Sequence, residues 1–222
     1  MVTPGSERQI GQNAGLSRQG PLVAFDFDGT LTVSDSFLAF LKWRTGASAY
    51  YADMARLAPA GLGYLFNRDK GRIKSAAIRV FLKGLPRQIL EQEAIEFAAV
   101  AAPLLLRPDA LKVWRRHRAD GARMVIVTAS PEPVVAPFAR GLGADLLIAS
   151  QVAYDARGLV GNGLSGPNCR GPEKAKRLRA LFGDEVRLAA AYGDSDGDQD
   201  MLDMADQKFM RLFVGDPSKR KP

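Results

Sequence analysis

Two aspartates stand two positions apart, directly after a short apolar run near the start of the chain. Asp26 and Asp28 follow residues 22–25 (LVAF) and precede Gly29-Thr30. Such a run is typical of a buried parallel strand, and ligands bind beyond the carboxyl ends of these strands. A carboxylate there can attack phosphorus or bind a divalent cation, and a second one can move protons. A turn or capping role would explain either aspartate alone.

Polar residues also follow the other apolar runs of the sequence. Thr128 and Ser130 come after one run, Asp194 and Asp198 come after another, and Lys174 opens the helix expected before the latter. Carboxyl ends of parallel strands share one edge of a sheet, so four carboxylates, a hydroxyl and a lysine are expected to converge. Clustered carboxylates repel one another unless a cation joins them, and Mg²⁺ with oxygen ligands fits this set.

The elements that must position these residues alternate between apolar runs and amphipathic stretches. Buried strands are expected at 22–25, 124–127, 146–148 and 188–191. Helices are expected near 108–119, 132–140 and 173–182, with two short antiparallel strands within 155–168. Strands that alternate with helices indicate an α/β fold with a parallel sheet.

Residues 35–102 show helical periodicity without a convincing strand. Phe37, Phe40 and Leu41 share one helical face, and Pro86 suits the start of a later helix. We therefore expect a helical cap over 35–104, inserted into a core made of 21–34 and 105–216. Residues 1–20, rich in Gly, Gln, Ser and Arg, are expected to be a disordered tail.

Taken together, the four polar segments resemble the motifs of haloacid-dehalogenase (HAD) superfamily phosphatases. The matching segments are residues 26–30 (DFDGT), Thr128, Lys174 and residues 193–198 (GDSDGD). The inserted helices resemble the C1-type cap of subfamily IB, the phosphoserine-phosphatase-like branch. Residues 168–174 (NCRGPEK) are also similar to the subgroup of phosphatidylglycerophosphatase C. The resemblance covers about residues 22–214 and implies a HAD-like Rossmannoid core.

The resemblance also implies catalytic roles. Asp26 is expected to form an aspartyl phosphate, and Asp28 to protonate the leaving group and later activate water. Thr128 and Lys174 are expected to hold phosphoryl oxygens. The metal ligands that it implies for Mg²⁺ are Asp26, the backbone carbonyl of Asp28, and Asp194, with Asp198 as a ligand or a support behind the ligands.

Four residues are candidates for substrate binding. Asp35 resembles an acidic residue that reads the ammonium of phosphoserine, but it also matches the lipid-headgroup subgroup and could equally cap a helix at Ser36. Arg79 resembles an arginine that binds the substrate carboxylate, although a solvated helix face also explains it. Ser130 and Arg170 complete the set, and Arg170 could share the role of Lys174.

Composition narrows the partners. The chain has 222 residues, 46% hydrophobic and 25% charged, with one cysteine and a net charge of +7, which favours anionic partners. No zinc-finger or aromatic RNA pattern accompanies the charge, so no nucleic acid is expected. No signal peptide is recognised, so a cytoplasmic location is expected. The apolar stretch 57–66 is too short to span a bilayer; it could contact a membrane peripherally or pack within the cap.

The expected function is Mg²⁺-dependent hydrolysis of a small phosphomonoester, phosphoserine-like or otherwise amine-bearing. One alternative is a phosphatidylglycerophosphate-type lipid-headgroup phosphatase at the membrane surface. Another is a catalytically silent phosphate-binding module, which the intact acid at Asp28 disfavours. The physiological substrate and the oligomeric state cannot be read from the sequence.

Overall fold

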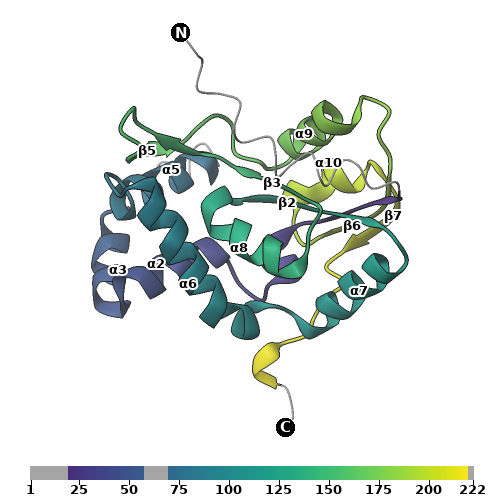
Figure 1. The fold of residues 1–222 in the computed structure, drawn as a ribbon, viewed down its shortest axis with the longest axis horizontal. Helices are drawn as coiled ribbons and strands as arrows, with labels where there is room; N and C mark the ends of the chain where they lie inside the picture. Colours follow the sequence, from purple (N-terminus) through teal and green to yellow (C-terminus); the bar gives the residue numbers. More distant parts are fainter. Residues whose placement is uncertain (1–19, 58–69, 220–222) are drawn as a thin grey trace.

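The computed structural model describes residues 20–57 and 70–219. Its centre is a five-stranded parallel sheet with the order β3-β2-β1-β6-β7 (Figure 1). The strands are β1 Leu22–Phe25, β2 Arg123–Pro131, β3 Leu146–Ser150, β6 Leu188–Gly193 and β7 Ala205–Met210. The α/β fold with a parallel sheet that the sequence predicts is therefore confirmed.

Strand register brings the carboxyl ends of three strands together. Phe25 at the end of β1 lies opposite Ile126 of β2 and Tyr192 of β6. The residues that follow in each strand therefore meet at one edge of the sheet, where ligands bind in open α/β folds.

Helices cover both faces of the sheet. Val23 and Phe25 of β1 point into a core shared with α7 (Pro108–Ala119) and α8 (Glu132–Leu142). Ala24, between them in sequence, enters a second core formed with α9 and α10. Helix α9 spans Pro172–Phe182 and α10 spans Gln199–Leu202. This alternation fits the two-residue period of a strand whose two faces are both buried.

The inserted block between β1 and β2 forms helices, as its periodicity predicts. These helices are α2 Ser36–Thr45, α3 Ala47–Ala55, α5 Lys70–Phe81 and α6 Arg87–Leu105. Figure 1 shows them grouped beside the sheet, on the left of the view. A short kinked segment, η1 (Phe27–Leu31), leads from β1 toward this cap, and its residues Asp28 and Gly29 have non-helical backbone angles.

A separate hairpin joins the cap to the core. Its strands, β4 Val152–Tyr154 and β5 Val160–Leu164, are antiparallel. Strand β5 lies within the predicted range 155–168, whereas β4 lies entirely before it. The Gly84 N–H donates to the Val160 carbonyl at 2.8 Å, and the Val160 N–H donates to the Leu85 carbonyl at 2.9 Å. These bonds attach the turn between α5 and α6 to the hairpin.

Some sequence predictions fall on residues that the structure does not describe. The predicted tail lies outside the described part except for Gly20, and so does the apolar stretch 57–66 except for Leu57, which is buried. Over the two described ranges, no helix has the length and apolar character needed to cross a membrane. Strand β7 and the short helices η2 (Asp196–Asp198) and η3 (Pro217–Lys219) were not predicted.

Candidate active site

Asp26 follows β1 at the centre of the sheet. Its N–H donates to the Tyr192 carbonyl at 2.8 Å, which continues the pairing with β6 for one more residue. Its Oδ1 accepts from Lys174 Nζ at 2.6 Å, and Oδ2 accepts a long bond from Thr30 Oγ1 at 3.4 Å. Burial raises the pKa of Asp26 to about 7; neighbouring carboxylates add to this increase, and the Lys174 ammonium opposes it. A buried carboxylate on a strand end is thus held in one orientation.

Lys174, in the first turn of α9, fixes that orientation. Its ammonium donates to Asp26 Oδ1, Asp198 Oδ1 and the Val127 carbonyl, each at 2.6 Å. Burial lowers the pKa of Lys174, but the two carboxylates more than offset this effect and the net shift is upward. All three donors lie on protein acceptors, so Lys174 positions Asp26 here, and its contact with phosphoryl oxygens remains a prediction.

Asp28 lies beyond Asp26 in η1, and its carboxylate is held from two sides. The Ser36 N–H donates to Oδ1 at 2.7 Å, and the Ser130 hydroxyl donates to Oδ2 in a short hydrogen bond. Burial raises the pKa of Asp28, the nearby Asp35 carboxylate raises it further, and the two hydrogen bonds oppose the increase. A carboxyl group with a raised pKa keeps its proton closer to neutral pH, as a general acid requires.

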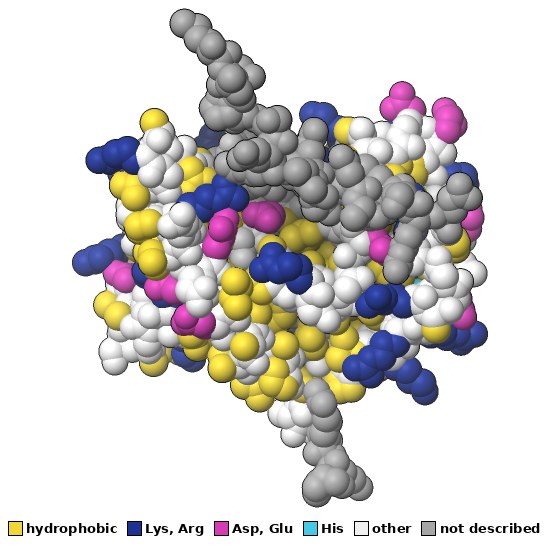
Figure 2. Space-filling view, in the orientation of Figure 1, with side chains coloured by type: hydrophobic (Ala, Val, Ile, Leu, Met, Phe, Trp, Pro, Cys, Tyr) yellow, Lys and Arg dark blue, Asp and Glu magenta, His cyan; other side chains and the backbone are white. Residues whose placement is uncertain are grey.

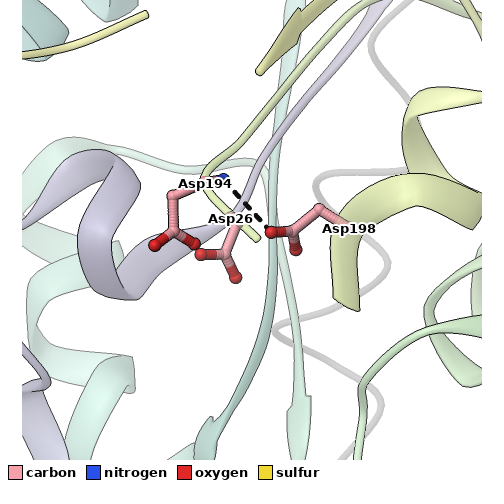
Figure 3. A group of neighbouring side chains, drawn as sticks. All are labelled: Asp26, Asp194 and Asp198. Carbon is pink, nitrogen blue, oxygen red and sulfur yellow. Dashed lines mark hydrogen bonds between the residues drawn. The ribbon is translucent and has the colours of Figure 1, made fainter. Parts of the chain in front are cut away.

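Three carboxylates meet next to the end of β1. Ligand oxygens of Asp26, Asp194 and Asp198 lie within 4.8 Å of one another. Figure 3 shows the three side chains converging from the end of β1, the loop after β6 and the short helix η2. Gly29 makes this approach feasible: it has φ +82°, and a Cβ there would lie 2.2 Å from Asp194 Oδ2. Asp198 Oδ2 accepts from the Asp194 and Ser195 N–H groups at 3.1 and 3.0 Å, which fixes the loop.

The cluster fits a hard divalent cation. Within the described residues, the Asp194 carboxylate accepts no hydrogen bond. Burial raises the pKa of Asp194, and the Asp198 carboxylate raises it further. Asp198, by contrast, has both oxygens engaged, and its pKa is lowered by Lys174 and backbone N–H groups against the effect of burial. Asp26 and Asp194 therefore offer the available oxygens, with Asp198 as their support. The Asp28 carboxylate lies outside this cluster, and a role for its backbone carbonyl remains a prediction.

The polar residues after β2 and before α9 take different places. Thr128 is 1% exposed and lines a cavity that lies between the site and the cap. Its Oγ1 accepts from the Ser130 N–H at 3.0 Å. Ser130 is fully buried and does not line the cavity, so the structure places it behind Asp28. Arg170 lines the cavity, and its Nη1 donates to Ser195 Oγ at 3.1 Å.

A cavity of about 520 Å³ lies between these residues and the cap. Asp35 lines it and also caps α2, because its Oδ1 accepts from the Leu38 N–H at 2.8 Å. Arg79 does not line the cavity and is exposed on α5. The structure thus brings Asp35 to the site and leaves Arg79 away from it.

Two lysines of α5 line this cavity, and neither was a candidate from the sequence. Lys74 Nζ donates to the Ala129 carbonyl at 2.5 Å, directly beside Thr128, and Lys70 lies one turn earlier. Burial lowers the pKa of Lys74, while the carboxylates of Asp35, Asp28 and Asp26 oppose that effect. The apolar positions of α5 suggested only a packing face. The i, i+4 spacing of the two lysines beside that face was the signal that could have indicated them.

Comparison with known proteins identifies the family of the chain. The family model for haloacid dehalogenase-like hydrolases matches residues 23–203. Protein CicA of Caulobacter vibrioides is 57% identical over 197 residues, which are 89% of this chain and 88% of CicA. A phosphoserine phosphatase of Halobacterium salinarum is 31% identical over 191 residues, covering 83% of this chain and 82% of that protein.

A solved structure is also similar. A protein of unknown function from Bordetella pertussis has a TM-score of 0.68 at 26% identity, with 83% of this chain and 86% of that chain covered. The family match spans most of the chain and includes Asp26, Asp28, Thr128, Lys174 and Asp194. The chain therefore belongs to the haloacid dehalogenase-like hydrolases.

Proposed function

We propose that the chain is a Mg²⁺-dependent phosphomonoesterase that works through an aspartyl phosphate on Asp26. The observation that carries this proposal is the carboxyl group of Asp28, which Ser36 and Ser130 hold two residues beyond the nucleophile. Its raised pKa suits a group that must give up a proton to a departing oxygen. A silent phosphate-binding module has no use for such an acid.

The reaction divides into two displacements at phosphorus. In the first, an Asp26 carboxylate oxygen forms a bond to phosphorus while the bond to the leaving oxygen breaks, and Asp28 donates its proton to that oxygen. In the second, the Asp28 carboxylate takes a proton from water, whose oxygen attacks phosphorus and releases inorganic phosphate from Asp26. Both groups return to their starting states.

The other residues hold charge and position. A Mg²⁺ ion bound by Asp26 and Asp194 would supply positive charge next to the phosphoryl oxygens. Lys174 keeps Asp26 in place through its 2.6 Å bond, and Asp198 holds both Lys174 and the Asp194 loop. Thr128 lies at the cavity wall, where its hydroxyl can donate to a phosphoryl oxygen.

For the substrate, the cap side of the cavity favours a small zwitterionic phosphomonoester. Asp35 lines this side, and in the described part of the chain only one of its carboxylate oxygens accepts a hydrogen bond. Lys70 and Lys74 bring positive charge to the same side. Groups of both signs match a leaving group that bears an ammonium and an anionic group, such as phosphoserine. The relative named phosphoserine phosphatase supports this class.

The test is phosphate release from a panel of phosphomonoesters with and without Mg²⁺. We expect Mg²⁺-dependent turnover of para-nitrophenyl phosphate and higher kcat/KM on amine-bearing substrates, with both lost in Asp26→Asn. Asp35→Ala should weaken amine-bearing substrates selectively. Absence of turnover on every substrate, or turnover that survives Asp26→Asn, would refute the enzyme assignment. Equal loss on all substrates in Asp35→Ala would refute the substrate class alone.

A further inference from the structure

A second hollow lies on another part of the molecule. A groove of about 630 Å³ runs between α6, α7 and α8, and none of its lining residues belongs to the site of Asp26. In Figure 2, apolar side chains gather over the lower middle of the face, where these helices lie in Figure 1, with Lys and Arg side chains beside them. The volume is within the range of small-molecule sites.

The floor of the groove is apolar. It includes Ala98 and Ala102 of α6, Trp114 of α7 and Phe138 of α8, and Ile95 at its edge is 46% exposed. Ala98, Trp114 and Phe138 are buried at the bottom of the groove, whereas Ile95 and Ala99 are exposed at the surface. Exposed apolar side chains with polar groups around them are typical of binding grooves.

The polar lining of the groove has one sign. Arg115, Arg118 and Arg140 line it, and no acidic residue does. Over residues 20–57 and 70–219, the guanidinium groups of Arg115 and Arg140 have no hydrogen bond or ion pair. Arg118 Nη1 donates to the Leu142 carbonyl at 2.7 Å, at the carboxyl end of α8. Two guanidinium groups are therefore available above an apolar floor, and a third is fixed beside them.

These features together define the ligand chemistry. Arginine forks pair with carboxylates or phosphates, whereas the floor favours hydrocarbon. We propose that this groove binds a single-chain anionic amphiphile, with the acyl chain on the floor and the anionic head between Arg115, Arg118 and Arg140. This site is separate from the phosphatase site and does not depend on the function proposed there.

A second copy of the chain is a poorer occupant. A two-fold interface brings the same patch of both subunits together, so it would place one set of arginines close to the other with no lining carboxylate between them.

The test uses the fluorescence of Trp114 in the 222-residue chain. The sequence has two tryptophans, so Trp43→Phe leaves Trp114 as the single reporter in the floor of the groove. The probe is dibromostearate at concentrations where it is monomeric, compared with the monoacylglycerol of the same brominated chain. We expect saturable quenching by the carboxylate and at least about tenfold weaker binding of the neutral analogue.

Two variants and one matched control locate the contact. Arg115→Glu with Arg140→Glu should weaken binding at least about tenfold, because two head-group partners become repulsive. Arg116→Glu makes, on α7 but outside the groove lining, the charge change that Arg115→Glu makes within it, and it should leave binding unchanged. Ala99→Phe fills the groove at an exposed position and should abolish quenching while phosphate release stays at its wild-type rate.

Four results would overturn the proposal. These are no saturable quenching, equal affinity for the neutral analogue, equal weakening by Arg116→Glu, and self-association of the wild type that Ala99→Phe removes. The last result would identify the groove as an interface between copies.

Discussion

The short distance in sequence between Asp26 and Asp28 hides a large difference in environment. Asp26 is bound to a fixed ammonium, whereas Asp28 is held by one N–H and one hydroxyl. Both pKa values are raised, but only Asp26 forms an ion pair with Lys174. Asp28 can therefore take up or release a proton without breaking an ion pair. The two residues should therefore fail in different ways when altered.

Asp28→Asn should separate the two halves of the reaction. Para-nitrophenolate leaves without a proton, so the variant should release about one equivalent rapidly and then stop, because no base remains to activate water. On alkyl phosphates, kcat should fall about a hundredfold to ten-thousandfold. Stopped-flow absorbance measures the burst, and Asp26→Asn is the control without one. Steady turnover of both substrates at similar rates would contradict the acid–base role.

Metal binding should depend on pH through Asp26. The metal-free carboxyl group has a pKa of about 7, above its ordinary value of 3.8, so a proton competes with the cation below neutral pH. The affinity for Mg²⁺ should be about tenfold weaker at pH 6 than at pH 8, with nearly one proton released on binding at pH 6. Calorimetry in two buffers of different ionisation enthalpy measures both. Equal affinity at the two pH values would show that no proton on Asp26 competes with the cation in this range.

Gly29 should matter for the metal more than for the fold. Gly29→Ala places a Cβ against Asp194 at a positive φ, so Mg²⁺ affinity and activity should fall sharply. Gly121→Ala is the matched control, since its φ is +81° and nothing lies within 4 Å of its Cβ. Both variants should lose about 1–2 kcal/mol of unfolding free energy. If both keep Mg²⁺ affinity, the approach of Asp194 is not what Gly29 provides.

At the scale of elements, the packing of helix α5 places the ammonium of Lys74, and not the guanidinium of Arg79, at the cavity. Lys74→Met should lower kcat/KM on zwitterionic phosphomonoesters about tenfold to a hundredfold, because the ammonium can no longer donate to the anionic group of the substrate's leaving part. Para-nitrophenyl phosphate has no anionic group on its leaving part, so its kcat/KM should fall less. Arg79→Met is the control on the same helix, and its kinetics should match the wild type. The opposite result would restore Arg79 to the site.

The elements that could be predicted from the sequence are those whose burial requires a recognisable pattern of apolar residues. Runs such as residues 124–127 are apolar because both faces of β2 are covered, so their strands could be found. Strand β7 could not, because its middle residues, Asp206, Gln207 and Lys208, are polar and exposed at the sheet edge. Only its pairing with β6, a tertiary contact, makes it a strand.

The candidate site divides in the same way. Asp26, Lys174, Asp194 and Asp198 could be named because they follow or precede buried strands at one sheet edge, and the structure brings them together. Lys74 could not be chosen over Arg79, because which face of α5 turns toward the core depends on how the cap packs. That packing involves contacts such as Ser75 against Gly163 of β5, far away in sequence.

At the scale of the whole molecule, cap and core share one apolar interior. Phe27 after β1 contacts Phe138 of α8, Phe138 contacts Phe97 of α6, and Phe97 contacts Phe40 of α2, with ring centroids 5.4–5.9 Å apart. The buried residues of the cap and of the sheet face covered by α7 and α8 form one cluster. Such continuity favours cooperative unfolding over independent opening of the cap.

Hydrogen exchange can therefore test whether the cap is a separate unit. The slowest amides of α6 and of β2 should open with free energies that agree within about 1 kcal/mol, because unfolding either element exposes the shared aromatic rings. Phe97→Ala should lower both values together by about 3–5 kcal/mol, the usual cost of removing a buried phenylalanine side chain. Ile95→Ala, on an exposed position of the same helix, is the control and should lower neither value by more than a fraction of that. If α6 opens at a much lower free energy while β2 keeps its protection, the cap is an independent unit and the aromatic contacts do not couple it to the core.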